Sequence, residues 1–569
     1  MIRSQLVQSR TEVVAERGVV SAGHMRVAEA GIRMFEEGGN AVDAIVAGAY
    51  TTFVVEPAQA GLGGYGRLGV FMAESRDFVT IDHYVRAPRL ARADMFEVDA
   101  SQPRMYYGWP RVAGQRNELG HLAAGVPGAV AGLCLAQERY GRLPLAQVLE
   151  PAIEAAEEGI PVTWNLVLAI TARLEGIRNL PETAAVFLPG GSPPKLSGLD
   201  RDADRIYLPD LAQTLRRIAS HGAAGFYTGP VAEAIEREFQ ANGGVLTAED
   251  LAAYEPKVLR EQPARYRGHA YVTANDPVGY ETLNILDHFD LARHGAESAE
   301  FRHLMAEALG HAFADNMTHY GDPDFTESPV NGLSSRTFGA ERARGINPSR
   351  AAPRPITAAD PWPYDSDATA PDVLPVTPSR GGVRGTSQIA TVDREGNMAA
   401  LITSLSNAFG SLVLVPGTGV LLNDGMQNFD PRPGRANSIA PGKMPIFAVP
   451  AIVAAQDGEA VFAAAGSGGY RIASAVLHTM VHALDFGLDL QAAVDAPRVH
   501  CQGEETFVDT RVPSDVQARL AGMGHQVVPQ EEAPGTYFFG RVSAVRRNPE
   551  SGLLHAASGP AWHTAAAGV

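Results

Sequence analysis

The sequence predicts a large mixed α+β protein, with helices dominating its first half and a β-hairpin opening the part that begins at residue 386. Three observations indicate this class. The 569 residues are 45% hydrophobic and 20% charged, as is typical of a globular chain long enough for two or more core layers. Apolar residues near the start recur at helical spacing. Short β-branched runs follow residue 386.

The early helices are predicted as a short, closely packed pair. Apolar residues repeat at i, i+4 and i+7 up to Phe35, and two glycines at 38–39 end the pattern. Asn40, with Asp43 three residues later, has the spacing of an N-cap for a second helix. Residues 56–66 then read EPAQAGLGGYG, which we interpret as a close approach of backbones. A phosphate cradle is the alternative, but no Lys-Ser/Thr pair follows these glycines.

Residues 124–291 have a helical texture broken by turns, without a repeat period. Residues 353–385 are rich in Pro, Asp, Gly and Ser, which predicts an exposed linker. A β-hairpin is predicted where the linker ends, from strands at 386–392 and 398–404 joined by DREGN. Further strands are predicted at 419–422, 451–454 and 461–464, before an amphipathic helix at 472–484.

The charge and the cysteines exclude several classes of protein. A formal net charge of −17 and the lack of a basic run argue against nucleic-acid binding. Cys134 and Cys501 are too far apart to predict a disulfide framework or a cysteine metal site. His478 and His482 have the i, i+4 spacing of a zinc pair, but they share a predicted helix with many apolar residues. We interpret them as helix-surface residues and expect no metal and no cofactor.

The start of the chain contains no apolar stretch of about seven residues, which a secretory signal requires. An uncharged run of about 18 apolar residues, as a membrane span needs, is also absent from the sequence. We therefore predict a cytoplasmic protein without a membrane partner.

Eleven blocks along the chain, in order, resemble gamma-glutamyltranspeptidases. They are GGNAVDA (38–44), EPAQAGLGG (56–64), GVPGAVAG (125–132), YGRLPLAQVLEPA (140–152), GFYTG (225–229), GGVLTAEDLAAY (243–254), YGDPDF (320–325), TSQIATVDREGN (386–397), FGS (409–411), PGTGVLLND (416–424) and GSGGYRI (466–472). The resemblance implies a four-layer αββα sandwich of the N-terminal-nucleophile hydrolase type. It also implies a chain that cuts itself between Gly385 and Thr386, so that segments 1–385 and 386–569 are partners within one intertwined domain.

The resemblance makes Thr386 the nucleophile, and its chemistry explains why cleavage must come first. A threonine hydroxyl is a weak nucleophile until a base takes its proton, and an N-terminal threonine carries that base as its own α-amine. The pKa of an α-amine is about 7.7 to 8.0, so a useful neutral fraction exists near pH 7. The residue-level pattern agrees, because a flexible linker that ends at a strand can present the scissile carbonyl while the new terminus stays in a sheet.

Other catalytic positions follow from the same resemblance. Gly468 and Gly469 match the glycine pair whose backbone N–H groups hold the tetrahedral oxyanion, and losing such a donor costs about 3 to 4 kcal/mol. The alternative for this pair is an ordinary strand-to-helix turn. Ser404 matches a threonine whose hydroxyl bonds the amine of the nucleophile, and a serine can keep that bond.

The substrate pocket departs from the family pattern. Tyr84 stands where γ-glutamyl-specific members have the arginine that binds the α-carboxylate, Asn428 replaces an aspartate and Ser406 an asparagine. The serine pair of those members corresponds to a position in PIFAVP, where this chain has Phe447 and Ala448 instead. Each charged contact to an amino-acid head group is lost, and such contacts are worth about 1.5 to 3 kcal/mol. Glutathione is therefore an unexpected substrate.

Arg86 offers one replacement cation. In an extended strand it would lie on the same face as Tyr84, about 7 Å further along, where it could anchor a substrate carboxylate. The alternative is a surface arginine. The leading functional prediction is an amidohydrolase that cleaves a small linear amide, like an acylase or an oxamate amidohydrolase. Two alternatives stay open: γ-glutamyl hydrolysis or transfer on glutathione-like compounds, and a non-catalytic family member.

Overall fold

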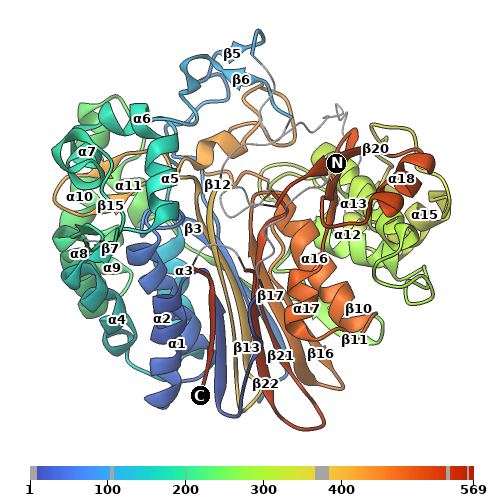
Figure 1. Cartoon of the computed structure of the whole chain (residues 1–569). Helices are drawn as coiled ribbons and strands as arrows, with labels where there is room; N and C mark the ends of the chain where they lie inside the picture. Colours follow the sequence, from blue (N-terminus) through green and yellow to red (C-terminus); the bar gives the residue numbers. More distant parts are fainter. Residues whose placement is uncertain are drawn as a thin grey trace.

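The computed structural model describes residues 9–102, 108–199, 201–365, 384–446, 448–532, 538–560 and 563–569 of the chain (Figure 1). It contains two seven-stranded sheets that lie face to face. The segment beginning at 384 contributes the centre of one sheet and most of the other, so the two halves of the sequence are interleaved. Helices cover the outer face of each sheet.

The first sheet carries the predicted hairpin at its centre. Its strand order is β23-β2-β12-β13-β3-β4-β9. The bounds are β2 Gly18–Ala22, β3 Tyr65–Met72, β4 Asp77–His83, β9 Lys257–Arg260, β12 Arg384–Asp393, β13 Met398–Asn407 and β23 Ala565–Gly568. All six of the pairings in this sheet are antiparallel. The predicted hairpin is confirmed, and its DREGN turn closes by a bond from Asp393 N to Asn397 O.

The second sheet packs on the first through contacts of β17 and β21 with β12. Its strand order is β1-β22-β21-β17-β16-β11-β10. The bounds are β1 Val13–Ala15, β10 Ala264–Tyr266, β11 His269–Val272, β16 Ile452–Gln456, β17 Glu459–Ser467, β21 Arg541–Arg547 and β22 Leu554–Ser558. The predictions of strands at 451–454 and 461–464 are confirmed by β16 and β17.

Two groups of helices cover the sheets. The group on the first sheet comprises α1 Met25–Glu36, α2 Ala41–Val55, α3 Ala129–Tyr140, α4 Leu145–Glu158, α5 Trp164–Ala172, α6 Leu174–Arg178, α7 Pro181–Phe187, α8 Pro209–His221, α9 Ala224–Tyr227, α10 Pro230–Ala241 and α11 Ala248–Ala252 (Figure 1). The group beside the second sheet comprises α12 Pro277–Leu286, α13 Ala299–His319, α14 Val330–Leu333, α15 Arg336–Gly345, α16 Arg471–Leu484, α17 Leu490–Asp495 and α18 Ser514–Gly522. The predicted mixed helix-and-sheet class is confirmed.

Smaller elements complete the fold. They are the pairs β5 Val98–Asp99 with β6 Arg111–Val112, β7 Ile160–Pro161 with β8 Arg205–Ile206, β14 Leu414–Val415 with β15 Val420–Leu421, and the sheet of β18 Val499–Cys501, β19 Glu505–Asp509 and β20 Gln526–Gln530. Among the described helices, none is both long and apolar enough to cross a membrane.

Local predictions about the first 70 residues are confirmed. The Asn40 side chain accepts from the Asp43 amide, and the Asp43 carboxylate accepts from the Asn40 amide, which is a complete capping box for α2. The glycines of 56–66 allow close packing: a Cβ on Gly64 would lie 2.6 Å from Ser404 O, and one on Gly66 would lie 2.1 Å from Ile402 O. These glycines seat the EPAQAGLGG segment directly against β13.

Two expectations differ from the structure. His478 and His482 lie on α16, as predicted, but both are buried rather than on the helix surface. The helix packs on the second sheet and on α12, and Phe301 of α13 contacts both histidine rings. Of the predicted linker, residues 353–365 are held on the body of the protein: Asp315 on α13 accepts a bond from Ala359 N at 2.7 Å. Residues 366–383 lie outside the described residues.

Candidate active site

The predicted scissile bond lies at an irregularity in the central hairpin. β12 and β13 pair in register up to Thr386, which lies opposite Ser404, but Gly385 lies opposite Ser406. Leu405 is therefore the extra residue of a β-bulge, which bends the strand locally. Ser406 has a φ of 83°, a left-handed conformation that costs a non-glycine residue about 1 to 3 kcal/mol. The backbone is thus strained beside the Gly385–Thr386 bond.

Thr386 is buried, and its hydroxyl group points at the bond that precedes it. The Thr386 Oγ1 donates to Gly385 O at 2.8 Å and lies 3.0 Å from Ser404 Oγ. Ser404 Oγ in turn donates to Gly385 O at 2.5 Å and accepts from Ser406 N at 2.8 Å. Two hydroxyl groups therefore converge on one carbonyl, so that one can attack it while the other polarises it.

The position of Gly385 requires a glycine. A Cβ there would lie 2.5 Å from Ala58 O and 2.6 Å from Asn407 O, distances that real Cβ atoms do not show. Because neighbouring backbone crowds it on two sides, the scissile carbonyl is held in place next to Thr386 and Ser404.

Gln59 contacts the nitrogen that cleavage would turn into an amine. The Thr386 N–H donates to Gln59 Oε1 at 3.1 Å, and Leu405 N donates to Gln59 O at 3.1 Å. The predicted partner of the amine was Ser404, which in the uncut chain bonds the hydroxyl group instead. Sequence reasoning missed Gln59, although it lies in the EPAQAGLGG block, because that block was interpreted only as packing.

The glycine pair follows β17 directly. Gly468 and Gly469 have φ values of 136° and 65°, which favour glycine. Among the described residues, neither amide donates to a backbone carbonyl, so both remain available to an oxyanion. Gly469 lines the same small cavity as Thr386. The structure therefore brings Gly469, one of the two predicted oxyanion donors, beside the predicted nucleophile.

A buried ion pair lies beside Thr386 and was missed by sequence reasoning. The Arg541 Nη2 atom donates to Thr386 O at 2.8 Å, and its Nη1 atom lies 3.7 Å from Glu56 Oε1. Glu56 also accepts a bond from Ser387 Oγ at 2.6 Å. Burial raises the pKa of the Glu56 carboxyl group above its ordinary value, while Arg541 and Ser387 oppose that rise.

The cavity beside Thr386 has a volume of about 30 Å³, which is close to the volume that one molecule occupies in liquid water. Its other walls are largely aromatic, apolar or hydroxyl-bearing, and the lining residues are Tyr65, Gly66, Arg67, Tyr84, Thr386, Ile402, Ser404, Ser406, Val449, Gly469 and Ile472. The rings of Tyr65 and Tyr84 meet edge to face at 4.6 Å. Asn428 donates to the Tyr65 hydroxyl at 3.0 Å and lies 3.5 Å from Ser406 Oγ. Tyr84 and Ser406 are thus wall residues, and Asn428 orients that wall.

The cation on this wall is Arg67, whose charge is balanced. Arg67 forms a buried ion pair with Asp82 at 2.7 Å and donates to Ala274 O at 2.9 Å. The prediction that Arg86 shares a strand face with Tyr84 is wrong, because β4 ends at His83. Arg86 instead bridges to Val126 and donates to Gly442 O at 3.5 Å, and it is not among the cavity's lining residues. Phe447 lies outside the described residues.

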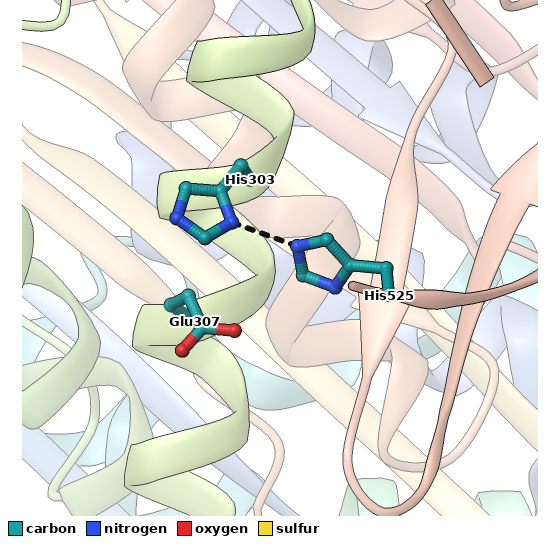
Figure 2. A group of neighbouring side chains, drawn as sticks. All are labelled: His303, Glu307 and His525. Atoms are coloured by element: carbon teal, nitrogen blue, oxygen red, sulfur yellow. Dashed lines mark hydrogen bonds between the residues drawn. The ribbon is translucent and has the colours of Figure 1, made fainter. Parts of the chain in front are cut away.

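One group of side chains among the described residues has the spacing of a metal site. His303, Glu307 and His525 place nitrogen and oxygen atoms within 4.8 Å of one another (Figure 2). His303 and Glu307 come from consecutive turns of α13, and His525 directly precedes β20. All three residues are buried.

The hydrogen bonds of this group are complete without a cation. His303 Nε2 lies 2.8 Å from Asn347 O and so donates to it, which leaves His303 Nδ1 to accept from His525 Nε2 at 2.8 Å (Figure 2). Burial lowers the pKa values of both histidines, that of His525 to about 3, which favours their neutral forms. Arg354 forms an ion pair with Glu307 and supplies the positive charge that this carboxylate needs. The group is therefore better described as a structural hydrogen-bonded cluster than as a metal site.

Comparisons with known proteins agree with the geometry. The gamma-glutamyltranspeptidase family model matches residues 27–569. A glutathione hydrolase proenzyme of Bacillus subtilis is 32% identical over 565 residues, covering 98% of this chain and 92% of the relative. The Acylase ACY 1 proenzyme of Pseudomonas sp. (strain V22) is 34% identical over 547 residues, covering 95% and 92%. The crystal structure of cephalosporin acylase from Bacillus halodurans aligns with a TM-score of 0.83 at 27% identity, covering 100% of this chain and 98% of that chain.

Proposed function

The chain belongs to the gamma-glutamyltranspeptidase family of hydrolases and acyltransferases, and we propose that it is a self-processing amidohydrolase with Thr386 as its nucleophile. The observation that carries this proposal is the convergence of the Thr386 and Ser404 hydroxyl groups on Gly385 O at a β-bulge. The two packed sheets with helices outside them support the four-layer αββα sandwich of the N-terminal-nucleophile hydrolases.

Self-cleavage proceeds through an ester. Thr386 Oγ1 adds to the carbonyl carbon of Gly385, and the C–N bond breaks as the proton of the hydroxyl group passes to the departing nitrogen. Gly385 is then esterified to Thr386 Oγ1, and water hydrolyses that ester. The products are the carboxyl group of Gly385 and a threonine with a free hydroxyl and a free α-amine. The bond from Ser404 Oγ stabilises the oxyanion formed at Gly385 O.

Turnover reuses the same atoms on an external amide. The α-amine takes the proton of Oγ1 as the hydroxyl attacks the substrate carbonyl, and the amine leaving group takes that proton as the C–N bond breaks. The amides of Gly468 and Gly469 hold the oxyanion, and Gln59 holds the amine. Water then releases the acyl group. We assign no second amine site, so hydrolysis rather than transfer is the proposed outcome.

The proposed acyl group lacks an α-amino-acid head. Tyr84 stands where γ-glutamyl-specific members have an arginine, and the charges of Arg67 and Asp82 balance each other within the cavity wall. A charged head group would be buried there without a counter-ion, at a cost of several kcal/mol. Small linear amides with acylase-like acyl groups fit this wall better than γ-glutamyl compounds. A relative named as an acylase, at 34% identity, supports this choice.

Intact-mass analysis and N-terminal sequencing of the purified protein test the first step. We expect two pieces, with TSQIA at the start of the smaller one, and a single uncut band for Thr386→Ala. Thr391→Ser is a matched control, because Thr391 is a buried threonine of the same strand that bonds Ala41 O instead. An amidase that turns over without a terminus at residue 386 would contradict the proposal.

An anilide panel tests the substrate class. We expect the processed protein to hydrolyse uncharged N-acyl anilides with a higher kcat/KM than a γ-glutamyl anilide. The reverse order would restore the γ-glutamyl alternative. Reactions supplemented with Gly-Gly report transfer. A processed protein that is inactive on every anilide of the panel, with and without Gly-Gly, would favour the non-catalytic alternative.

A further inference from the structure

The ion pair beside Thr386 is divided between the two segments that cleavage would create. Arg541 lies at the start of β21 and Glu56 follows α2, and both side chains are nearly fully buried, with 2% and 3% exposed. Arg541 Nε donates to Ser467 Oγ at 2.8 Å, and its Nη2 donates to Thr386 O. The cation and the nucleophile are therefore fixed within segment 386–569, whereas the anion belongs to segment 1–385.

The cation lies close to the future amine. The nitrogen and oxygen of one residue are at most about 3.7 Å apart with standard bond lengths. Since Arg541 Nη2 is 2.8 Å from Thr386 O, it lies within about 6.5 Å of Thr386 N. Charges about 4 to 6 Å away shift a pKa by about 1 to 3 units, and a buried pair is screened little by salt. Arg541 is therefore placed to act on the amine. Glu56 lies 3.7 Å from Arg541 Nη1 and accepts from the hydroxyl group of Ser387, the residue that follows Thr386, so it is placed to oppose the effect of Arg541.

We propose that Arg541 lowers the pKa of the Thr386 α-amine, so that the amine is an unprotonated base at neutral pH, and that Glu56 partly offsets this effect. The inference rests on the proposed function, because the amine exists only after cleavage. A positive charge disfavours a second positive charge nearby, so Arg541 favours the neutral amine, while an ionised Glu56 favours the protonated one. The pair thus sets the fraction of active base.

This arrangement survives cleavage because the cut removes only one bond at Thr386. From Ile389 to Asp393, β12 remains paired to β2, and from Thr386 to Val392 it remains paired to β13. The bonds from Arg541 to Thr386 O and Ser467 Oγ remain within one segment. Arg541 is therefore a positioning residue that stays with the base it adjusts.

Other charges near Thr386 are balanced or occupied elsewhere. On β3 and β4, which lie beyond β13 in the same sheet as β12, Arg67 and Asp82 pair with each other at 2.7 Å. Beyond β13, Asp424 accepts from the backbone N–H of Asn407 at 2.9 Å and from its side chain at 2.7 Å. Among the described residues, Arg541 bonds the Thr386 backbone and Glu56 bonds the side chain of its neighbour Ser387.

The test measures the amine itself and requires no substrate. Processed protein is labelled with a trace of acetic anhydride over a range of pH, and mass spectrometry of the N-terminal peptide of the small piece reports acetylation of Thr386. The expected apparent pKa in the unsubstituted protein lies below the usual 7.7 to 8.0. Arg541→Gln should raise it by about one unit or more, and Glu56→Gln should lower it by about half a unit or more.

Opposite shifts are the signature, because a merely structural role would move both variants in the same direction. Arg541→Lys keeps the charge and should leave the pKa near its starting value. Arg547→Gln is the matched control. Arg547 lies on β21 like Arg541, but its ion pair with Glu459 is partly exposed, so this variant should leave the amine pKa unchanged. If Arg541→Gln is not processed, the other two variants test the inference: Glu56→Gln should lower the amine pKa, and Arg541→Lys should leave it near its starting value.

Two failures remain distinguishable. Absence of a TSQIA terminus in the unsubstituted protein overturns the proposed function and this inference together. A protein that is processed and active, but whose amine pKa does not move in opposite directions in the two glutamine variants, overturns the inference alone.

Discussion

The two sides of the cavity differ in what they retain from the family. On the side made by the β12–β13 hairpin, the hydroxyl groups of Thr386 and Ser404 bond Gly385 O, and Gly469 lines the same cavity as Thr386. The other side carries Tyr65, Tyr84 and Arg67, whose charge Asp82 balances, and the family resemblance predicts an arginine where Tyr84 stands. Under the proposed function, bond cleavage and acyl recognition rest on different segments of the chain, and the difference teaches that the two can change separately.

Thr386→Ala should have the largest effect and should be independent of substrate. Without Oγ1 neither self-cleavage nor turnover has a nucleophile, so we expect a single uncut chain and a fall in turnover of about 10⁴-fold or more. A denaturing gel and an anilide assay measure both. Thr386→Ser retains the hydroxyl group and should still be cut, while cleavage in Thr386→Ala would place the nucleophile elsewhere.

Gly469→Ala should have the next largest effect on the same side. An alanine at a φ of 65° is strained and turns the amide away from the oxyanion, so kcat should fall by about 10²- to 10³-fold with little change in KM. Gly417→Ala is the matched control, because Gly417 has a φ of 70° and open space around it. An equal loss in both variants would mean that strain, rather than the oxyanion bond, matters.

Gln59→Leu should have a smaller effect, because one hydrogen bond to the amine is lost while the hydroxyl groups remain. A single bond of this kind contributes about 0.5 to 1.5 kcal/mol, which predicts a fall in kcat of up to about tenfold. Stopped-flow or steady-state assays on the processed variant measure it. Unchanged kcat would show that the amine is held by other groups after cleavage.

The sequence indicated which hairpin residues come together at Thr386, but it missed the residues that support Thr386 from other elements, and the reason is physical. Thr386, Ser404 and the glycine pair lie in continuous blocks whose spacing reflects local strand and turn geometry. Glu56, Gln59 and Arg541 reach the nucleophile only through long-range strand and helix packing, which no local pattern encodes.

The incorrect predictions have related causes. The expectation for Arg86 assumed a strand that in fact ends at His83, and strand ends are the least certain feature of a sequence pattern. His478 and His482 were expected on a helix surface, but a second layer of helices buries that face. Burial by a partner element cannot be read from the helix alone.

Tyr84→Arg should have the smallest effect, and it tests the other side of the cavity. The new guanidinium would lie near Arg67, whose Cζ atom is 5.7 Å from the centroid of the Tyr84 ring, so the wall would carry one net positive charge. Because a charge-assisted contact contributes about 1.5 to 3 kcal/mol and repulsion from Arg67 offsets part of it, we expect a gain of about three- to tenfold in relative kcat/KM. The ratio measured is kcat/KM for a carboxylate-bearing acyl anilide over kcat/KM for an uncharged one, and the gain is the increase of this ratio over that of the unsubstituted protein.

Tyr84→Phe removes the hydroxyl group without adding charge and should leave this ratio as it is in the unsubstituted protein. If Tyr84→Arg slows self-cleavage as strongly as Gly469→Ala slows turnover, the two sides are not separable and recognition is coupled to bond cleavage.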